Sequence, residues 1–181
     1  MLRKILVAGF LGGVLLVVWT FVANTYFGFY SRVYLKRGPN ERAVYTVLND
    51  NLAAPGRYIF NPALTPEGTF PLRDPVFAVM YSGIGHEAAG REMYTRLAFF
   101  FVISWIAAAM LALASSRVLC SYPRRVLFVA AIGLLMALYS DFPQSGIAGF
   151  PLHDGLLLAA YSVLTWLLLG LLLAWRIRAE S

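Results

Sequence analysis

Residues 155–175 read GLLLAAYSVLTWLLLGLLLAW and contain no charged side chain. A membrane-spanning helix needs about 20 predominantly apolar residues, because the hydrocarbon core is about 30 Å thick and a helix rises about 1.5 Å per residue. The stretch therefore predicts a transmembrane helix. Arg176 and Arg178 follow it directly, and arginine side chains at a helix end can reach the lipid headgroups.

Three further apolar stretches, residues 5–29, 97–114 and 126–140, are long enough or nearly so to span a bilayer. Of the 181 residues, 60% are hydrophobic and 13% are charged, whereas about 25% of the residues in an average soluble domain are charged. We predict an all-α membrane protein, a bundle of four transmembrane helices with a small periplasmic α+β insertion between the first two. We expect the first helix to be retained, because its apolar run exceeds the roughly 7–15 residues of a signal peptide core.

Lysine and arginine are unevenly distributed among the connecting segments. Residues 1–4, 115–125 and 176–181 hold seven of them and one acid, which accounts for the whole formal net charge of +6. Residues 30–96 and 141–154 hold eight of them and eight acids. Short loops rich in lysine and arginine remain in the cytoplasm. We therefore predict a bacterial inner-membrane protein with both termini, the 115–125 loop and the 176–181 tail in the cytoplasm, and with the other two segments in the periplasm.

The position of the cations also bears on partners. They flank the apolar stretches rather than forming a basic stripe with interleaved aromatic residues, so we predict contact with the lipid bilayer and none with nucleic acid. Cys120 is the only cysteine. A single thiol excludes an intrachain disulfide and the cysteine pair that membrane thiol oxidoreductases require.

Residues 30–96 are the only extramembrane segment long enough for a small folded unit. Asn40 and Glu41 suit the start of a helix, and apolar residues then recur at helical spacing until Pro55-Gly56, a strong turn signal. Residues 57–60 and 75–82 read as two short strands. A two-stranded ribbon is marginal alone, so this unit should pack on the bundle, on a partner protein or on a second copy of the chain. In the first span, Gly9, Gly12 and Gly13 predict close packing against another helix.

No ionisable residue lies within the apolar stretches, which argues against a proton pump, a coupled transporter or an ion channel formed by one subunit. We assign no catalytic residue and predict no metal. Imidazoles and carboxylates are metal ligands, so the weak candidates for a metal site are His86, Glu87, Asp141, His153 and Asp154. Their spacing does not support a metal site, and solvated loop residues, or a hydrogen bond joining the insertion to the 141–154 hairpin, explain them better.

Aromatic residues of the spans could line a groove for a hydrophobic ligand at the outer leaflet. We place it near Trp19, Phe99 and Phe142. A bound lipid or quinone is possible there, although no cofactor is predicted. Aromatic residues at helical spacing are more often packing or lipid contacts.

Several short patterns resemble a group of uncharacterised bacterial four-span inner-membrane proteins. These are the basic start before a glycine-bearing first span with Trp19, Asn40-Glu41-x-Ala43-Val44, Pro55-Gly56-x-Tyr58-x-Phe60 and Arg124-Arg125-Val126-Leu127-Phe128. The resemblance implies four spans, a periplasmic insertion and a bacterial host. It supplies no activity. Members of the group place a proline soon after the aromatic residue of the strand, whereas here Asn61 precedes Pro62.

These observations favour a non-catalytic accessory or structural subunit of a membrane assembly, with a protein partner or a second copy binding through the periplasmic segment. One alternative is a binder of a lipid or quinone between the helices. Another is a metal-dependent enzyme at the periplasmic face. The sequence favours a protein without enzymatic activity but does not decide the question.

Overall fold

The computed structural model describes residues 2–34, 36, 38–60, 76–85, 88–145 and 149–178. Four helices within these residues are long and apolar enough to cross a membrane, in agreement with the number of apolar stretches in the sequence. Three of them are α1 (Leu2–Thr25), α4 (Ala89–Ala112) and α7 (Leu152–Arg176). The fourth is α6 (Tyr122–Met136), which continues through a π-helical turn and a 3₁₀ turn to Gln144. These helices are compatible with a multi-pass membrane protein.

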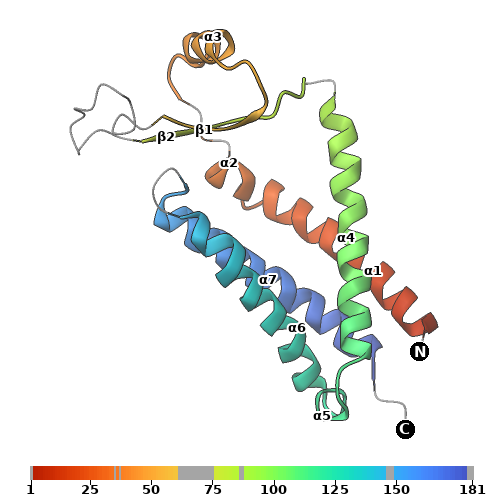
Figure 1. Cartoon of the computed structure of the whole chain (residues 1–181). Coiled ribbons are helices and arrows are strands. Elements are labelled where there is room, and N and C mark those ends of the chain that lie inside the picture. Colours follow the sequence, from red (N-terminus) through yellow and green to blue (C-terminus); the bar gives the residue numbers. More distant parts are fainter. Residues whose placement is uncertain are drawn as a thin grey trace.

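The spans pack as two pairs. Helix α1 lies against α4, α6 lies against α7, and α1 also contacts α7, so the order across the bundle is α4, α1, α7, α6 (Figure 1). The start of α1, the end of α7 and the short helix α5 (Ser116–Leu119) lie at one end of the bundle. We call this end the inner end and the opposite end the outer end. These names carry no assignment to a membrane face.

Glycines let α1 and α4 approach closely, as the sequence predicts. The Trp105 side chain covers Gly9, Ser104 covers Gly12 and Phe101 covers Gly13, so that a Cβ atom on any of these glycines would overlap a side chain of α4. Small residues of this kind allow the van der Waals contact that holds helices together in lipid.

The second pair uses the same principle. Gly133 of α6 lies under Trp166 of α7, and a Cβ on Gly170 of α7 would lie 3.1 Å from the carbonyl oxygen of Val126. The spans therefore meet at small residues in both pairs.

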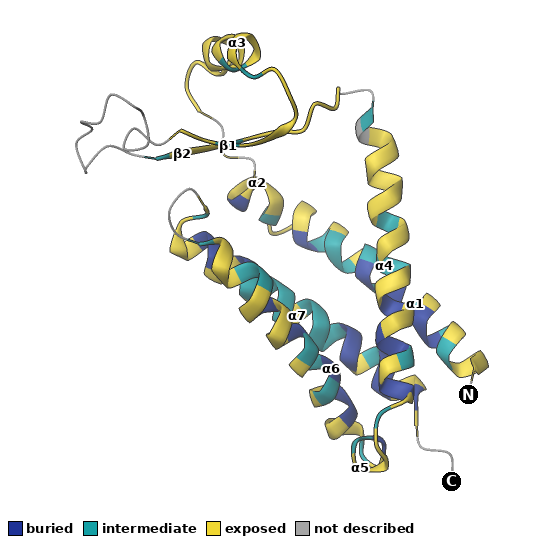
Figure 2. Ribbon diagram, in the orientation of Figure 1, coloured by how far each residue is buried: buried dark blue, intermediate teal, exposed yellow. Residues whose placement is uncertain are grey.

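Most of the buried core lies toward the inner end, where the four spans converge (Figure 2). Its residues include Ala8, Ala107, Ala108, Leu111, Leu119, Val129, Leu169, Leu173 and Ile177. In α4 the burial begins only at Ser104, and none of residues 90–103 is buried. The bundle is therefore closed at its inner end, while the outer half of α4 has little packing.

The insertion forms a helix and a ribbon, as predicted. Helix α3 (Glu41–Asn51) is followed by strands β1 (Gly56–Phe60) and β2 (Phe77–Tyr81), which pair antiparallel with Tyr58 opposite Val79. A short helix, α2 (Phe29–Val33), joins α1 to this unit. Figure 1 shows the ribbon between α3 and the outer end of the bundle.

The start of α3 differs from the expected cap. Asn40 has a φ of 60° and its side chain makes no capping hydrogen bond. Instead, the carbonyl oxygen of Asn40 accepts from the backbone N–H groups of Ala43 and Val44 at 3.0 and 3.2 Å. Asparagine tolerates this left-handed conformation better than most residues, so it serves here as a turn residue and not as a side-chain cap.

Candidate functional site

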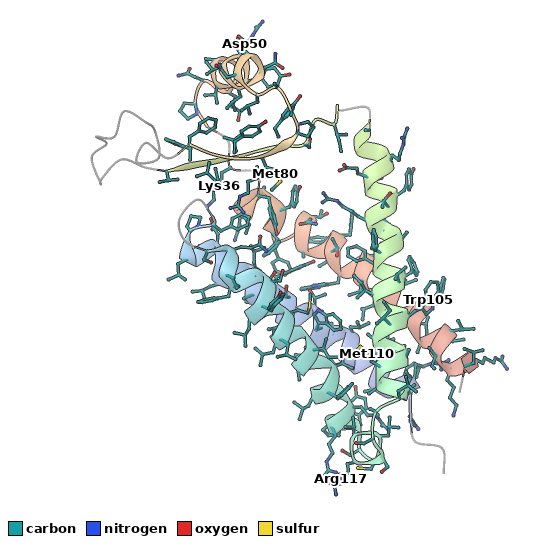
Figure 3. The ribbon with its side chains drawn as sticks, viewed as in Figure 1. Lys36, Asp50, Met80, Trp105, Met110 and Arg117 are labelled. Atoms are coloured by element: carbon teal, nitrogen blue, oxygen red, sulfur yellow. The ribbon has the colours of Figure 1, made fainter. Side chains whose placement is uncertain are left out.

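A buried carboxylate marks the outer end of the bundle. Asp154 lies in the first turn of α7, and only 4% of its surface is exposed. Lys36, which follows α2, donates from Nζ to Asp154 Oδ2 at 2.5 Å (Figure 3), and His153 Nδ1 lies 3.3 Å from Asp154 Oδ1. The helix dipole also stabilises a carboxylate at this position. The ion pair therefore joins the segment after the first span to the start of the last span, through a lysine that the sequence did not single out.

The weak metal candidates are only partly placed. His86 and Glu87 lie outside the described residues. Asp141, at the end of the π-helical turn, has a buried Oδ2 that bonds to no described residue. Among the described residues, no three histidine, cysteine or acidic side chains come together in a group that could hold a metal ion. The placed residues therefore give no support to a metal-dependent enzyme.

Tyr34 lies between the insertion and the bundle. Its ring meets the Phe150 ring edge-on, with 5.5 Å between centroids, and the Tyr30 ring at 5.2 Å. Burial raises the pKa of the Tyr34 phenol above its ordinary value, and the Asp141 carboxylate raises it further, against a smaller opposite effect of Arg96. The phenol is therefore neutral at physiological pH and can act as a hydrogen-bond donor, but not as a base.

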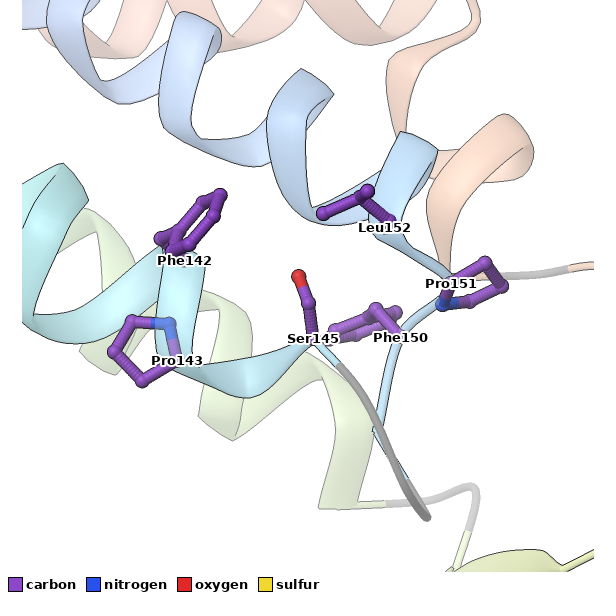
Figure 4. A pocket seen from close by; sticks show the side chains of 6 residues that line it. All are labelled: Phe142, Pro143, Ser145, Phe150, Pro151 and Leu152. Atoms are coloured by element: carbon purple, nitrogen blue, oxygen red, sulfur yellow. The ribbon is translucent and has the colours of Figure 1, made fainter.

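A hollow of about 380 Å³ opens beside the hairpin that precedes α7 (Figure 4). It is lined by Phe142, Pro143, Ser145, Phe150, Pro151 and Leu152. The hydroxyl of Ser145 points between Phe142 and Leu152 and is buried without a hydrogen-bond partner among the described residues. A side chain at position 155 would overlap this hydroxyl, so Gly155 leaves room for it. The hollow is an apolar surface with one unpaired hydroxyl.

A second hollow, of about 490 Å³, lies at the start of α4. Its lining combines charged, polar and apolar side chains, namely Ile84, Ala88, Arg91, Glu92, Thr95, Arg96 and Phe99. Arg91 and Arg96 make no hydrogen bond or ion pair through their side chains with any described residue. This hollow is the more polar of the two and lies where the apolar part of α4 begins.

The two hollows do not bring Trp19, Phe99 and Phe142 into one groove. Phe142 lines the first hollow and Phe99 lines the second. The indole of Trp19 donates to Thr165 Oγ1 at 2.8 Å and stacks on Tyr161, with 6.0 Å between ring centroids. The three aromatic residues therefore serve separate surfaces, because they lie on helices that diverge toward the outer end.

At the inner end, hydrogen bonds from two arginines hold the loop that contains α5. Arg125 is 7% exposed and donates from Nη1 to the Leu119 carbonyl oxygen at 2.8 Å. Cys120 is a free, exposed thiol whose sulfur accepts from Arg124 Nη1 at 3.2 Å. These contacts fold the α5 loop onto the start of α6.

Comparisons with protein families, with curated proteins and with solved structures found no match.

Proposed function

We propose that this chain is a non-catalytic accessory or structural subunit of a bacterial inner-membrane assembly. In this proposal both termini lie in the cytoplasm, and α3 with the β1–β2 ribbon lies in the periplasm and binds a protein partner. The uneven distribution of lysine and arginine among the connecting segments supports this orientation.

The observation that carries the proposal is the lack of burial in this unit. No residue of α3, β1 or β2 is buried, and large apolar side chains such as Ile59, Phe77 and Met80 are more than half exposed. In residues 40–60 and 76–85, only Leu48, Leu52, Tyr58, Val76 and Val79 are partly buried. Two strands alone are marginally stable, so a further packing surface is needed.

The ribbon also offers a way to bind. Neither strand pairs with any described strand other than its neighbour, so each has an edge that can accept a strand from another protein. Main-chain hydrogen bonds would supply affinity, and the exposed side chains would supply specificity. A third strand would bring the sheet to the size at which it becomes stable.

Photo-crosslinking in intact cells tests the partner. A photoreactive residue at Ile59 or Met80, on the ribbon, should give a crosslink to a different protein that co-purifies in mild detergent. The control position is Asp50, which lies on the side of α3 that faces away from the ribbon (Figure 3). Recovery of the protein with crosslinks only to itself, or with none, would refute the proposal.

The orientation is tested separately. A side-specific reporter at position 181 should respond on the cytoplasmic side, and one inserted at position 68 on the periplasmic side. The reverse result would place the insertion in the cytoplasm and remove the basis for a periplasmic partner.

A second candidate function is the binding of a lipid or quinone at the Ser145 hollow, favoured by the unpaired hydroxyl in an apolar surface. A buried hydroxyl without a partner costs free energy that a carbonyl or ester oxygen of a ligand would recover. Solvent extraction of the purified protein should release such a molecule, and the Ser145→Ala variant should retain less of it. Equal retention by both proteins would remove this candidate.

A further inference from the structure

Helix α4 carries one face with two different chemistries along its length. At the start of the helix this face holds Arg91, Glu92, Thr95 and Arg96 around the hollow of about 490 Å³. Nearer the inner end, the same face is apolar. It consists of Phe99, Val102, Ile103, Ile106 and Met110, which are 57%, 43%, 38%, 55% and 44% exposed. We call these five residues the apolar stripe.

Helical spacing shows that the polar hollow and the apolar stripe are continuous. Positions 88, 92, 95, 99, 102, 106 and 110 are three or four residues apart, and such positions share one face of a helix. The residues of α4 that cover the glycines of α1, namely Phe101, Ser104 and Trp105, lie on the opposite side. The stripe therefore faces away from α1 and is not covered by it.

The dimensions of this surface fit a lipid. From Phe99 to Met110 the helix advances about 16 Å, since each residue rises about 1.5 Å. One leaflet of a bilayer core is about 15 Å thick, half of about 30 Å. An acyl chain that begins beside Phe99 would therefore follow the stripe to its end at Met110.

The charges of the hollow fit a headgroup. Arg91 and Arg96 line the hollow together with Thr95, and neither guanidinium group makes a hydrogen bond or ion pair with a described residue. Arginine binds phosphate through two parallel hydrogen bonds. Glu92 adds a carboxylate to the same hollow and makes no ion pair with a described residue. A carboxylate beside a phosphate site repels an anionic headgroup but accepts hydrogen bonds from a primary ammonium group.

We propose that this face of α4 binds a glycerophospholipid with an ethanolamine headgroup. The phosphate lies between Arg91 and Arg96, the ammonium group at Glu92, and one acyl chain along the apolar stripe. The site is separate from the Ser145 hollow, and it depends on neither function proposed above.

The test uses the full-length protein in vesicles of equal parts phosphatidylethanolamine, phosphatidylglycerol and phosphatidylcholine. After gentle extraction, native mass spectrometry should show a retained phosphatidylethanolamine. The Arg91→Gln, Arg96→Gln double variant should retain at most about one tenth as much phosphatidylethanolamine. The reason is that losing a hydrogen bond to a charged group weakens binding by at least about tenfold. The matched control, Arg42→Gln, removes an arginine from the exposed helix α3, outside the proposed site, and should behave as the unmodified protein.

Further variants separate the parts of the site. Glu92→Gln should keep phospholipid binding but lose the preference for ethanolamine over glycerol headgroups. Added inorganic phosphate should not displace the lipid, since the stripe contributes to binding. Unchanged retention by the double variant, when circular dichroism shows the same helix content, would refute the proposal, and so would equal retention of the three lipids or displacement by phosphate alone.

Discussion

Substitution of Gly12 by alanine tests the packing that holds the bundle together. A Cβ atom at this position would overlap Ser104 Oγ and lie 2.7 Å from Leu169 Cδ1. Two of the four spans would therefore have to shift to admit one methyl group. Overpacking of this kind costs about 1–3 kcal/mol. On the scale of soluble domains of this size, this cost lowers the midpoint of thermal unfolding by about 2–12 °C.

The matched control is Gly90→Ala, the same glycine-to-alanine substitution at another position. A Cβ at Gly90 meets no atom within 4 Å, and alanine is favoured over glycine in a helix by up to about 1 kcal/mol. This variant should be as stable as the unmodified protein or slightly more stable. Both variants can be compared by tryptophan fluorescence during heating in one mild detergent.

A double-mutant cycle with Ser104→Ala locates the clash. Ser104 is fully buried, and its hydroxyl has no hydrogen-bond partner in the part of the chain that the structure describes, so its removal alone should cost little. In combination, Ser104→Ala should recover part of the loss caused by Gly12→Ala, with a coupling of about 0.5–3 kcal/mol. If Gly12→Ala were as stable as Gly90→Ala, or if the two substitutions were additive, the close contact between α1 and α4 would be refuted.

Two further predictions concern the outer end. Lys36→Met removes the partner of the buried Asp154 carboxylate. Amide hydrogen exchange should therefore become faster at the start of α7 and in residues 38–60. Unchanged exchange would show that the ion pair does not hold these segments together. Because the pKa of Tyr34 is raised in the folded state, the unfolded chain ionises this phenol first. Stability should therefore fall as the pH rises past the ordinary tyrosine pKa of about 10, and Tyr34→Phe should reduce this loss, as measured by unfolding at a series of alkaline pH values.

The spans and their glycine contacts could be predicted because they depend on local composition. A run of apolar residues as long as the bilayer core is thick has few alternatives to a helix. Gly9, Gly12 and Gly13 indicate a helix contact because the absence of a side chain lets a neighbouring helix approach the backbone. The sequence does not show that Ser104 and Trp105 would be the residues above them, since this depends on the angle and height at which α4 crosses α1.

The outer site could not be predicted for a related reason. Lys36 and Asp154 are 118 positions apart, and no spacing rule links a cation after the first span to an acid at the start of the last. The first hollow requires Phe150 to lie beside Ser145, with which it forms an isolated parallel bridge. The polar start of α4 was assigned to the insertion because it is charged, although the helix begins eight residues before the apolar stretch at residue 97.

The distribution of side-chain size explains why both hollows lie away from the inner end. There, alanines such as Ala107, Ala108 and Ala112 let the spans converge around a buried apolar core. Toward the outer end, α4 carries Phe99 instead and separates from the other three spans (Figure 1), whereas α1 stays packed on α7 through Trp19 and Thr165. Bulky residues hold helices apart, and the surface they leave must be covered by lipid or protein. A substitution that enlarges the alanines should therefore destabilise the bundle itself, whereas a substitution on the outer half of α4 should change what binds there and leave the fold intact.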